Sequence, residues 1–184
     1  MKHMKQLHFS RSRAARTTAV ATFLAVAVVG VSAATAQPTG KPRTMDPSEL
    51  IALYSDKTWM WERGGGYMAP GGDFTGYVAG QNRDESTYAT GKWWTTDQGV
   101  MCFRATWHVR SSGKLDEKCF GHRTDGDVIF QRVEPNGFWY VFRTQMAPHP
   151  KDEFAKLRSG DRVSIRARWL QATFARQSPP TRQQ

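Results

Sequence analysis

The middle of the chain consists of short aromatic and β-branched runs separated by turn-forming residues, and this pattern limits the fold more than any other feature. Between residues 57 and 142, Gly, Asn, Asp and Ser residues recur so often that the longest run without one is residues 100–110. Short runs bounded in this way are typical of an antiparallel meander, in which each strand pairs with the next. The expected strands are residues 58–62, 66–69, 74–80, 86–95, 100–109, 117–123, 127–134 and 137–144.

The turns between these runs indicate how the strands pair. Asp125-Gly126 and Asn136-Gly137 are the strongest turn signals, because these residue types accept the positive φ that tight hairpin turns demand. Pairing strand 100–109 with strand 117–123 across a Ser-Ser-Gly turn brings Cys102 near Cys119.

A helix is expected before the first strand. Asp46 is a good N-cap, Pro47 suits the first helical position, and Glu49 can reach back to the amide of the cap. The helix is expected to run to about Ser55. Its apolar residues, Leu50, Ile51, Leu53 and Tyr54, give it a side that caps the domain.

The C-terminal part predicts a short helix, a last strand and a tail. Residues 152–157 are expected to be helical, and Val163, Ile165, Ala167 and Trp169 alternate with Ser164, Arg166 and Arg168 as in a strand with one basic face. Residues 171–184 are assigned to a basic, disordered tail.

The expected fold is a mainly β domain over residues 46–170, with the N-terminal helix as a cap and the short C-terminal helix beside it. Eight or nine strands in so small a domain tend to curl until few edges remain exposed. We therefore expect a small antiparallel up-and-down barrel, lipocalin-like in form, or a strongly curved, half-open sheet.

The N-terminus has the pattern of a cleavable secretory signal. Five basic residues precede an apolar run of about 15 residues, which is shorter than the roughly 20 that a spanning helix needs. Small residues end this run, and we expect cleavage after Ala36. The predicted mature chain begins with a flexible leader, residues 37–45, lacks a transmembrane segment and lies in the periplasm.

The net charge of +10 does not indicate binding to nucleic acid. The 26 basic residues outnumber 16 acidic ones, but the excess lies in the predicted signal and in residues 151–184. The strands are electrically balanced and offer no basic face to phosphates, so we expect no nucleic-acid partner.

The two cysteines are expected to form a disulfide. Cys102 and Cys119 are the only cysteines of the chain, and an isolated pair in an oxidising compartment is typically bonded. The alternative, a zinc site formed by both cysteines with His108 and His122, would need the two free thiolates. We therefore expect no metal and no other cofactor.

Several phrases of this sequence resemble a family of exported proteobacterial proteins catalogued as domain of unknown function 995. The similarity covers roughly residues 47–142, depends on spaced Trp, Gly and Cys positions, and implies a bacterial periplasmic location without supplying an activity. The phrases are Leu50-Ile51-Ala52-Leu53-Tyr54, Lys57-Thr58-Trp59-Met60-Trp61, Gly66-Tyr67, Gly72-Asp73-Phe74, Gly91-Lys92-Trp93 and Gly99-Val100-Met101-Cys102-Phe103, with Trp107 and Cys119.

Seven tryptophans are many for one small domain, and they supply the candidate binding residues. Large aromatic residues usually fill a core, but a barrel cavity lined by such rings can also hold an apolar or sugar-like ligand. The candidate ligand-binding residues are Trp59, Trp61, Tyr67, Trp93 and Trp107.

No catalytic residues are predicted, because no serine or histidine has the surroundings of a nucleophile or its base. The expected function is a non-enzymatic binding module for an apolar or glycan ligand or an envelope component. The alternative is a protein-interaction role, such as inhibition of an exported hydrolase. The expected partner is an unidentified small ligand or an envelope protein.

Overall fold

A curved antiparallel sheet forms the body of the protein. The computed structural model describes residues 40–110, 112–145 and 149–177. Eight strands pair in chain order, β10 adds to β2 at one end, and the two-residue β1 pairs with β7. Each of the eight predicted strands is present. The strands are β1 Arg43–Thr44, β2 Lys57–Trp61, β3 Gly64–Met68, β4 Asp73–Val78, β5 Thr87–Thr95, β6 Val100–Val109, β7 Ser112–Asp125, β8 Val128–Val133, β9 Tyr140–Arg143 and β10 Leu157–Ser159.

Contacts between distant strands show how strongly the sheet curls. Strands β2 and β7 are five spacings apart in the strand order, a separation of roughly 24 Å if the sheet were flat. The ring centroids of Trp59 on β2 and Phe120 on β7 are nevertheless 5.0 Å apart. The sheet therefore wraps around its own core, and the prediction of a strongly curved sheet is confirmed in the form of a half-barrel.

The two ends of the sheet are bridged by side chains. Strands β9 and β10 end the strand order, and within the described residues they share no ladder of hydrogen bonds. The short 3-10 helix η2, Glu153–Lys156, lies between them and contacts β2, β9 and β10. Phe154 packs edge-on against Phe142 of β9. Side-chain packing thus closes the gap that a full barrel would close with backbone hydrogen bonds.

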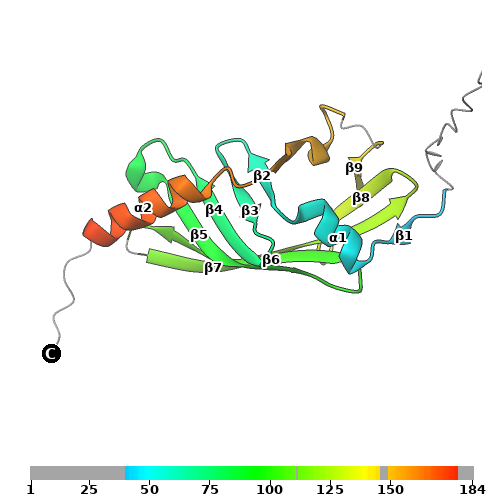
Figure 1. The fold of residues 1–184 in the computed structure, drawn as a ribbon, viewed down its shortest axis with the longest axis horizontal. Helices are drawn as coiled ribbons and strands as arrows, with labels where there is room; N and C mark the ends of the chain where they lie inside the picture. The colour runs from blue at the N-terminus through cyan, green and yellow to red at the C-terminus, as the bar shows by residue number, and fades with distance from the viewer. Residues whose placement is uncertain (1–39, 111, 146–148, 178–184) are drawn as a thin grey trace, which may run out of the picture. The chain divides into compact units, whose positions relative to one another are not determined.

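The N-terminal helix α1, Pro47–Tyr54, has the predicted capping box. The Asp46 carboxylate accepts from the Glu49 amide at 2.9 Å, and the Glu49 carboxylate accepts from the Asp46 amide at 2.9 Å. Leu50, Leu53 and Tyr54 are buried in the main core. The prediction that this helix caps the domain is confirmed (Figure 1).

The predicted last strand, residues 163–169, is wrong, because these residues begin helix α2, Ser164–Gln177. The Asp161 carboxylate caps the helix by accepting from the amides of Val163 and Ser164. Ile165 and Trp169, which the alternation placed on a buried face, are 79% and 54% exposed. The residues that are buried follow the helical period instead: Ser164, Ala167, Leu170, Thr173 and Phe174.

Helix α2 packs on the convex face of the sheet, opposite α1. It contacts β4 and β5, where Ala167, Leu170 and Phe174 pack with Tyr88 and with the partly buried Tyr77. Figure 1 shows α2 along these strands, at the opposite end of the sheet from α1. The convex face therefore has a small core of its own.

Other boundaries also differ from the prediction. The short helix expected at 152–157 is the single 3-10 turn η2, and residues 171–177 of the predicted tail belong to α2. Residues 43–44 of the predicted leader form β1. The predicted signal, 1–36, and residues 178–184 of the predicted tail lie outside the described residues.

The disulfide predicted between Cys102 and Cys119 is present. The two residues are directly opposite each other on β6 and β7, with Cα atoms 4.1 Å apart. Their positions alternate with the core residues Met101 and Phe103, so the bond lies on the convex face.

Removing this disulfide should lower stability without changing the fold. Its 17-residue separation corresponds to about 3 kcal/mol in the chain-entropy model, which amounts to roughly 5–10 °C in the melting temperature of a domain of this size. Thermal melts of a Cys102→Ala, Cys119→Ala double variant should show this loss. Denatured wild-type protein should contain no reactive thiols, and finding two would contradict the assignment.

Candidate functional site

The concave face of the half-barrel is covered at one end and more open at the other. Near α1 it is filled by the main core, in which Phe74 and Phe103 stack at 4.5 Å. Farther from α1 the floor includes Gly66 and Gly76, which are paired on β3 and β4. We take this second end as the candidate site because aromatic side chains there remain partly exposed.

Trp61 and Trp107 meet across the curve at this end. Trp61 lies on β2 and Trp107 on β6, yet their ring centroids are 5.8 Å apart. Trp107 lies directly over Gly76, where an added Cβ would be 2.8 Å from the ring. Only glycine at this position leaves room for the indole, so the local sequence and the curl together place the pair.

A groove of about 420 Å³ adjoins Trp107. Its other sides are formed by β4, β5 and the long free end of β7. Lys118 lies 3.7 Å from Asp116, and Lys114 has no ion pair within the described residues. The groove therefore combines an indole with one carboxylate and two ammonium groups. Its lining residues are Val78, Thr87, Trp107, Lys114, Asp116 and Lys118.

Three of the five predicted site residues lie elsewhere. Trp59 and Trp93 are core residues: the Trp59 indole donates to Glu153 at 2.9 Å, and the Trp93 indole donates to the Ala69 carbonyl at 2.7 Å. Tyr67 alternates with Gly66 and Met68, so its side chain lies on the convex face. Its hydroxyl donates to Asp56 at 2.8 Å, which raises the pKa of Tyr67 to about 12.

The charged wall of the groove, formed by Lys114, Asp116 and Lys118, was not predicted from the sequence. Lys114, Asp116 and Lys118 alternate along one face of β7, a period of two that indicates a strand. The strand predicted from the sequence begins only at residue 117, so Lys114 and Asp116 lie outside it. The wall is the free part of β7, which extends past its pairing with β8.

The four residues of the alternative zinc site do not converge. Both cysteines are bonded to each other, and His108 stacks on Tyr88 of the convex face with ring centroids 4.7 Å apart. His122 lies in the core on the concave side, 5.4 Å from the Tyr54 ring. These residues therefore cannot ligate one ion.

His122 belongs to a buried network of polar side chains that links α1 to β7, β8 and β9. The Gln131 amide nitrogen lies 2.8 Å from both the Tyr54 oxygen and His122 Nε2, and Tyr54 lies 2.8 Å from the same nitrogen of His122. The Tyr140 hydroxyl donates to the Gln131 carbonyl oxygen. Because an amide NH₂ group only donates, His122 Nε2 accepts and the ring proton lies on Nδ1.

Burial holds His122 in its neutral form. It lowers the pKa of this histidine to about 4, against the opposing effect of the Phe120 and Gly99 backbone groups. A second proton would have to bind at Nε2, which faces the donating NH₂ group of Gln131. Nδ1 has no hydrogen-bond partner within the described residues, so the charge of a protonated ring would not be relieved there either.

Residues 20–163 match a protein family described as Protein of unknown function (DUF995). The chain belongs to this family. Comparisons with curated proteins and with solved structures gave no match. The DUF995 description names no activity, so the function must be argued from the groove itself. Among the described residues, no helix is long and apolar enough to cross a membrane.

The buried His122 should make stability depend on pH between 6.5 and about 4. The pKa of His122 is lowered in the folded state, so the unfolded chain binds the proton at a higher pH than the folded chain does. The contribution of neutral His122 to the free energy of unfolding is therefore fully present above pH 6.5 and is lost as the pH falls toward 4. The difference amounts to roughly 3 kcal/mol. Urea unfolding of wild type and His122→Gln across this range should show a shallower slope in the variant, which keeps only the contribution of carboxylates with lowered pKa values such as those of Asp46 and Glu49.

The matched control for this experiment is His108→Gln, which replaces the histidine that stacks on the convex face. This variant should keep the wild-type slope. Equal slopes for wild type and His122→Gln would show that protonation of the buried His122 does not cause the pH dependence of stability.

Proposed function

We propose that this DUF995 protein is an exported, non-enzymatic binding module of the periplasm. Its groove beside Trp107 binds an envelope ligand that presents an apolar or sugar-ring face to the indole. The observation that carries this proposal is the position of Trp107, held over Gly76 and against Trp61 at the open end of the concave face.

The chemistry of the groove supports a ligand with both flat and polar parts. An indole face contributes a large contact area, and the position of Trp107 is fixed by contacts with Gly76 and Trp61, neither of which lines the groove. The ammonium and carboxylate groups of Lys114, Asp116 and Lys118 border it and can bind hydroxyl or acidic groups. Ligand pockets commonly combine an apolar surface with a few polar groups in this way.

The same lining argues against catalysis in the groove. Its single carboxylate, Asp116, faces Lys118, and no histidine or cysteine is among the lining residues that the structure describes. A nucleophile paired with a base, as acyl transfer requires, is missing from this set.

Truncating Trp107 should weaken ligand binding strongly. We would titrate the folded protein with N-phenyl-1-naphthylamine as an apolar probe and with chitotetraose as a glycan probe, following probe fluorescence and heat respectively. At least one probe should bind, and Trp107→Ala should weaken that binding tenfold or more because the stacking surface is removed. Native mass spectrometry of protein purified from the periplasm should reveal a bound molecule that Trp107→Ala lacks.

The control is Trp169→Ala, which removes an indole that is 54% exposed on α2. Its affinities should equal those of wild type. Failure of both probes together with a bare protein from the periplasm would refute a ligand role for the groove.

One observation favours the alternative role in protein interaction. Phe138, which lies between β8 and β9, is 94% exposed, and Tyr140 and Val141 of β9 are also exposed. Exposed aromatic residues of this kind often mark protein interfaces. If a protein co-purifies from the periplasm and is lost in Phe138→Ser but retained in Trp107→Ala, the interaction role replaces the ligand role.

A further inference from the structure

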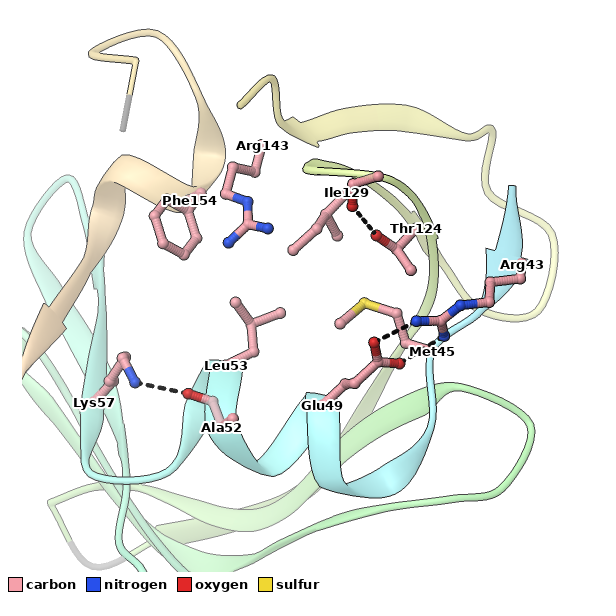
Figure 2. A pocket seen from close by; sticks show the side chains of 11 residues that line it. Arg43, Met45, Glu49, Ala52, Leu53, Lys57, Thr124, Ile129, Arg143 and Phe154 are labelled. Carbon is pink, nitrogen blue, oxygen red and sulfur yellow. Dashed lines mark hydrogen bonds and ion pairs between the residues drawn. The ribbon is translucent and has the colours of Figure 1, made fainter. Parts of the chain in front are cut away.

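A second pocket lies at the α1 end of the half-barrel, between α1 and strands β7, β8 and β9. It has a volume of about 340 Å³, and its walls come from α1, from the starts of β1 and β2, from β7 to β9 and from η2. Figure 2 shows this pocket with α1 along one side and the side chain of Arg143 entering from the other. It is separate from the groove, with which it shares no lining residue.

The walls of this pocket are apolar side chains with basic groups among them. Met45, Leu53, Ile129 and Phe154 form the apolar part. The charged lining residues are Arg43, Lys57 and Arg143, with Glu49 as the only carboxylate among the lining residues that the structure describes.

Glu49 does not neutralise the pocket, because its charge is already engaged. Both of its oxygens accept from the Arg43 guanidinium, at 2.6 and 2.8 Å, and one of them also accepts from the Asp46 amide of the capping box. The Arg43–Glu49 pair therefore cancels, and the charges of Lys57 and Arg143 are left over.

Arg143 is placed to receive an anion. Its guanidinium is half-buried, lies 5.3 Å over the Phe154 ring, and donates from Nε to the Asp127 carbonyl at 3.1 Å. No carboxylate of the described residues forms an ion pair with it. In Figure 2 the remaining guanidinium nitrogens point into the pocket, between Phe154 and Ile129. Burial lowers the pKa of Arg143, and the negative charge of Asp127 opposes this effect only in part.

Lys57 provides the second positive charge. Its ammonium group donates to the Ala52 carbonyl at 3.0 Å, near the C-terminal end of α1. Like Arg143, it has no ion pair within the described residues. One carbonyl uses a single donor of the three that an ammonium group has, so the others remain available.

We propose that this pocket binds a small amphipathic anion, with its acidic group at Arg143 and its apolar part against Leu53, Met45 and Ile129, while Lys57 adds a second positive charge to the lining. A planar guanidinium on an aromatic ring suits a carboxylate or phosphate oxygen pair, which it can bind with two parallel hydrogen bonds. The volume is at the small end of ligand pockets, which favours a short chain over a whole lipid. This inference is independent of the function proposed for the groove.

Octanoate is a suitable probe, and octan-1-ol is its uncharged counterpart. Isothermal titration of the full mature protein should show octanoate binding with one site per chain and octan-1-ol binding at least tenfold more weakly. Octyl phosphate in the same series shows which acidic group the pocket prefers, because the two headgroups share the proposed contacts.

Variants of the charged residues should act in opposite directions. Arg143→Gln should weaken octanoate binding about tenfold or more, because it removes the cation that contacts the acid. Lys57→Gln should weaken it several-fold, because it removes the second positive charge of the lining. Glu49→Gln should strengthen it several-fold, because the only lining carboxylate becomes neutral while the side chain still accepts from the Asp46 amide. Circular dichroism shows whether each variant is folded. If Arg143→Gln does not fold, Lys57→Gln provides the test of the positive charge.

The control variant is Arg110→Gln, which removes a surface arginine paired with Asp84 outside the pocket. It should bind octanoate as wild type does. Equal affinity for octanoate and octan-1-ol, or no change in either cation variant, would overturn the proposal even if Trp107 proves essential for a ligand in the groove.

Discussion

Contacts between aromatic side chains across the inside of the sheet are the interaction on which the rest of this structure depends. Trp59 with Phe120 and Trp61 with Trp107 join strands that would be far apart in a flat sheet. Because Gly66 and Gly76 have no side chains, the rings of Trp61 and Trp107 can pack against the backbone of β3 and β4. Each aromatic pair contributes only about 1 kcal/mol beyond its buried area. Together with the burial of their apolar surface, however, these aromatic pairs stabilise the curled sheet, which encloses a core, over a flat one.

The curl stops short of closure, and this has chemical consequences. The 3-10 helix η2 lies between the end strands β9 and β10, where a closed barrel would have a continuous ladder, and α1 packs into the adjoining core. In this core, Tyr54, His122, Gln131 and Tyr140 form hydrogen bonds with one another, and His122 Nδ1 is left without a partner among the described residues. A buried network of this kind is costly when one member is missing, which makes the position of α1 specific.

The sequence predicted the features that depend on neighbours along the chain. The Asp46 capping box, the eight strands of the meander and the Cys102–Cys119 pairing follow from local patterns, and all are present. The strand expected at 163–169 was wrong because Val163 and Ala167 fit both a period of two and a helical turn. The decisive residues, the Asp161 cap and the buried Leu170 and Phe174, lie outside that window.

The candidate site was only partly predictable for a different physical reason. Alternation assigns Trp59 and Trp61 to one face of β2, but it does not say which residue of β6 they meet, because that depends on the amount of curl. Nor does it separate a core indole from an exposed one on the same face. Trp59 lies under α1 and is buried, whereas Trp61, two residues farther, lies where that cover is absent.

The two ends of the half-barrel therefore differ in how firmly their walls are fixed. At the α1 end, moving the helix would leave His122 and Gln131 without the Tyr54 hydroxyl, and unpaired polar groups in a core cost free energy. The pocket beside Arg143 is accordingly preformed, and a ligand there need not provide the energy to order it. At the other end, the free part of β7 forms one wall of the groove without a paired neighbour on its outer side. That wall can adjust to its ligand. Selectivity in the groove therefore depends less on the shape of the ligand than on its contacts with the indole face and the adjacent charged groups.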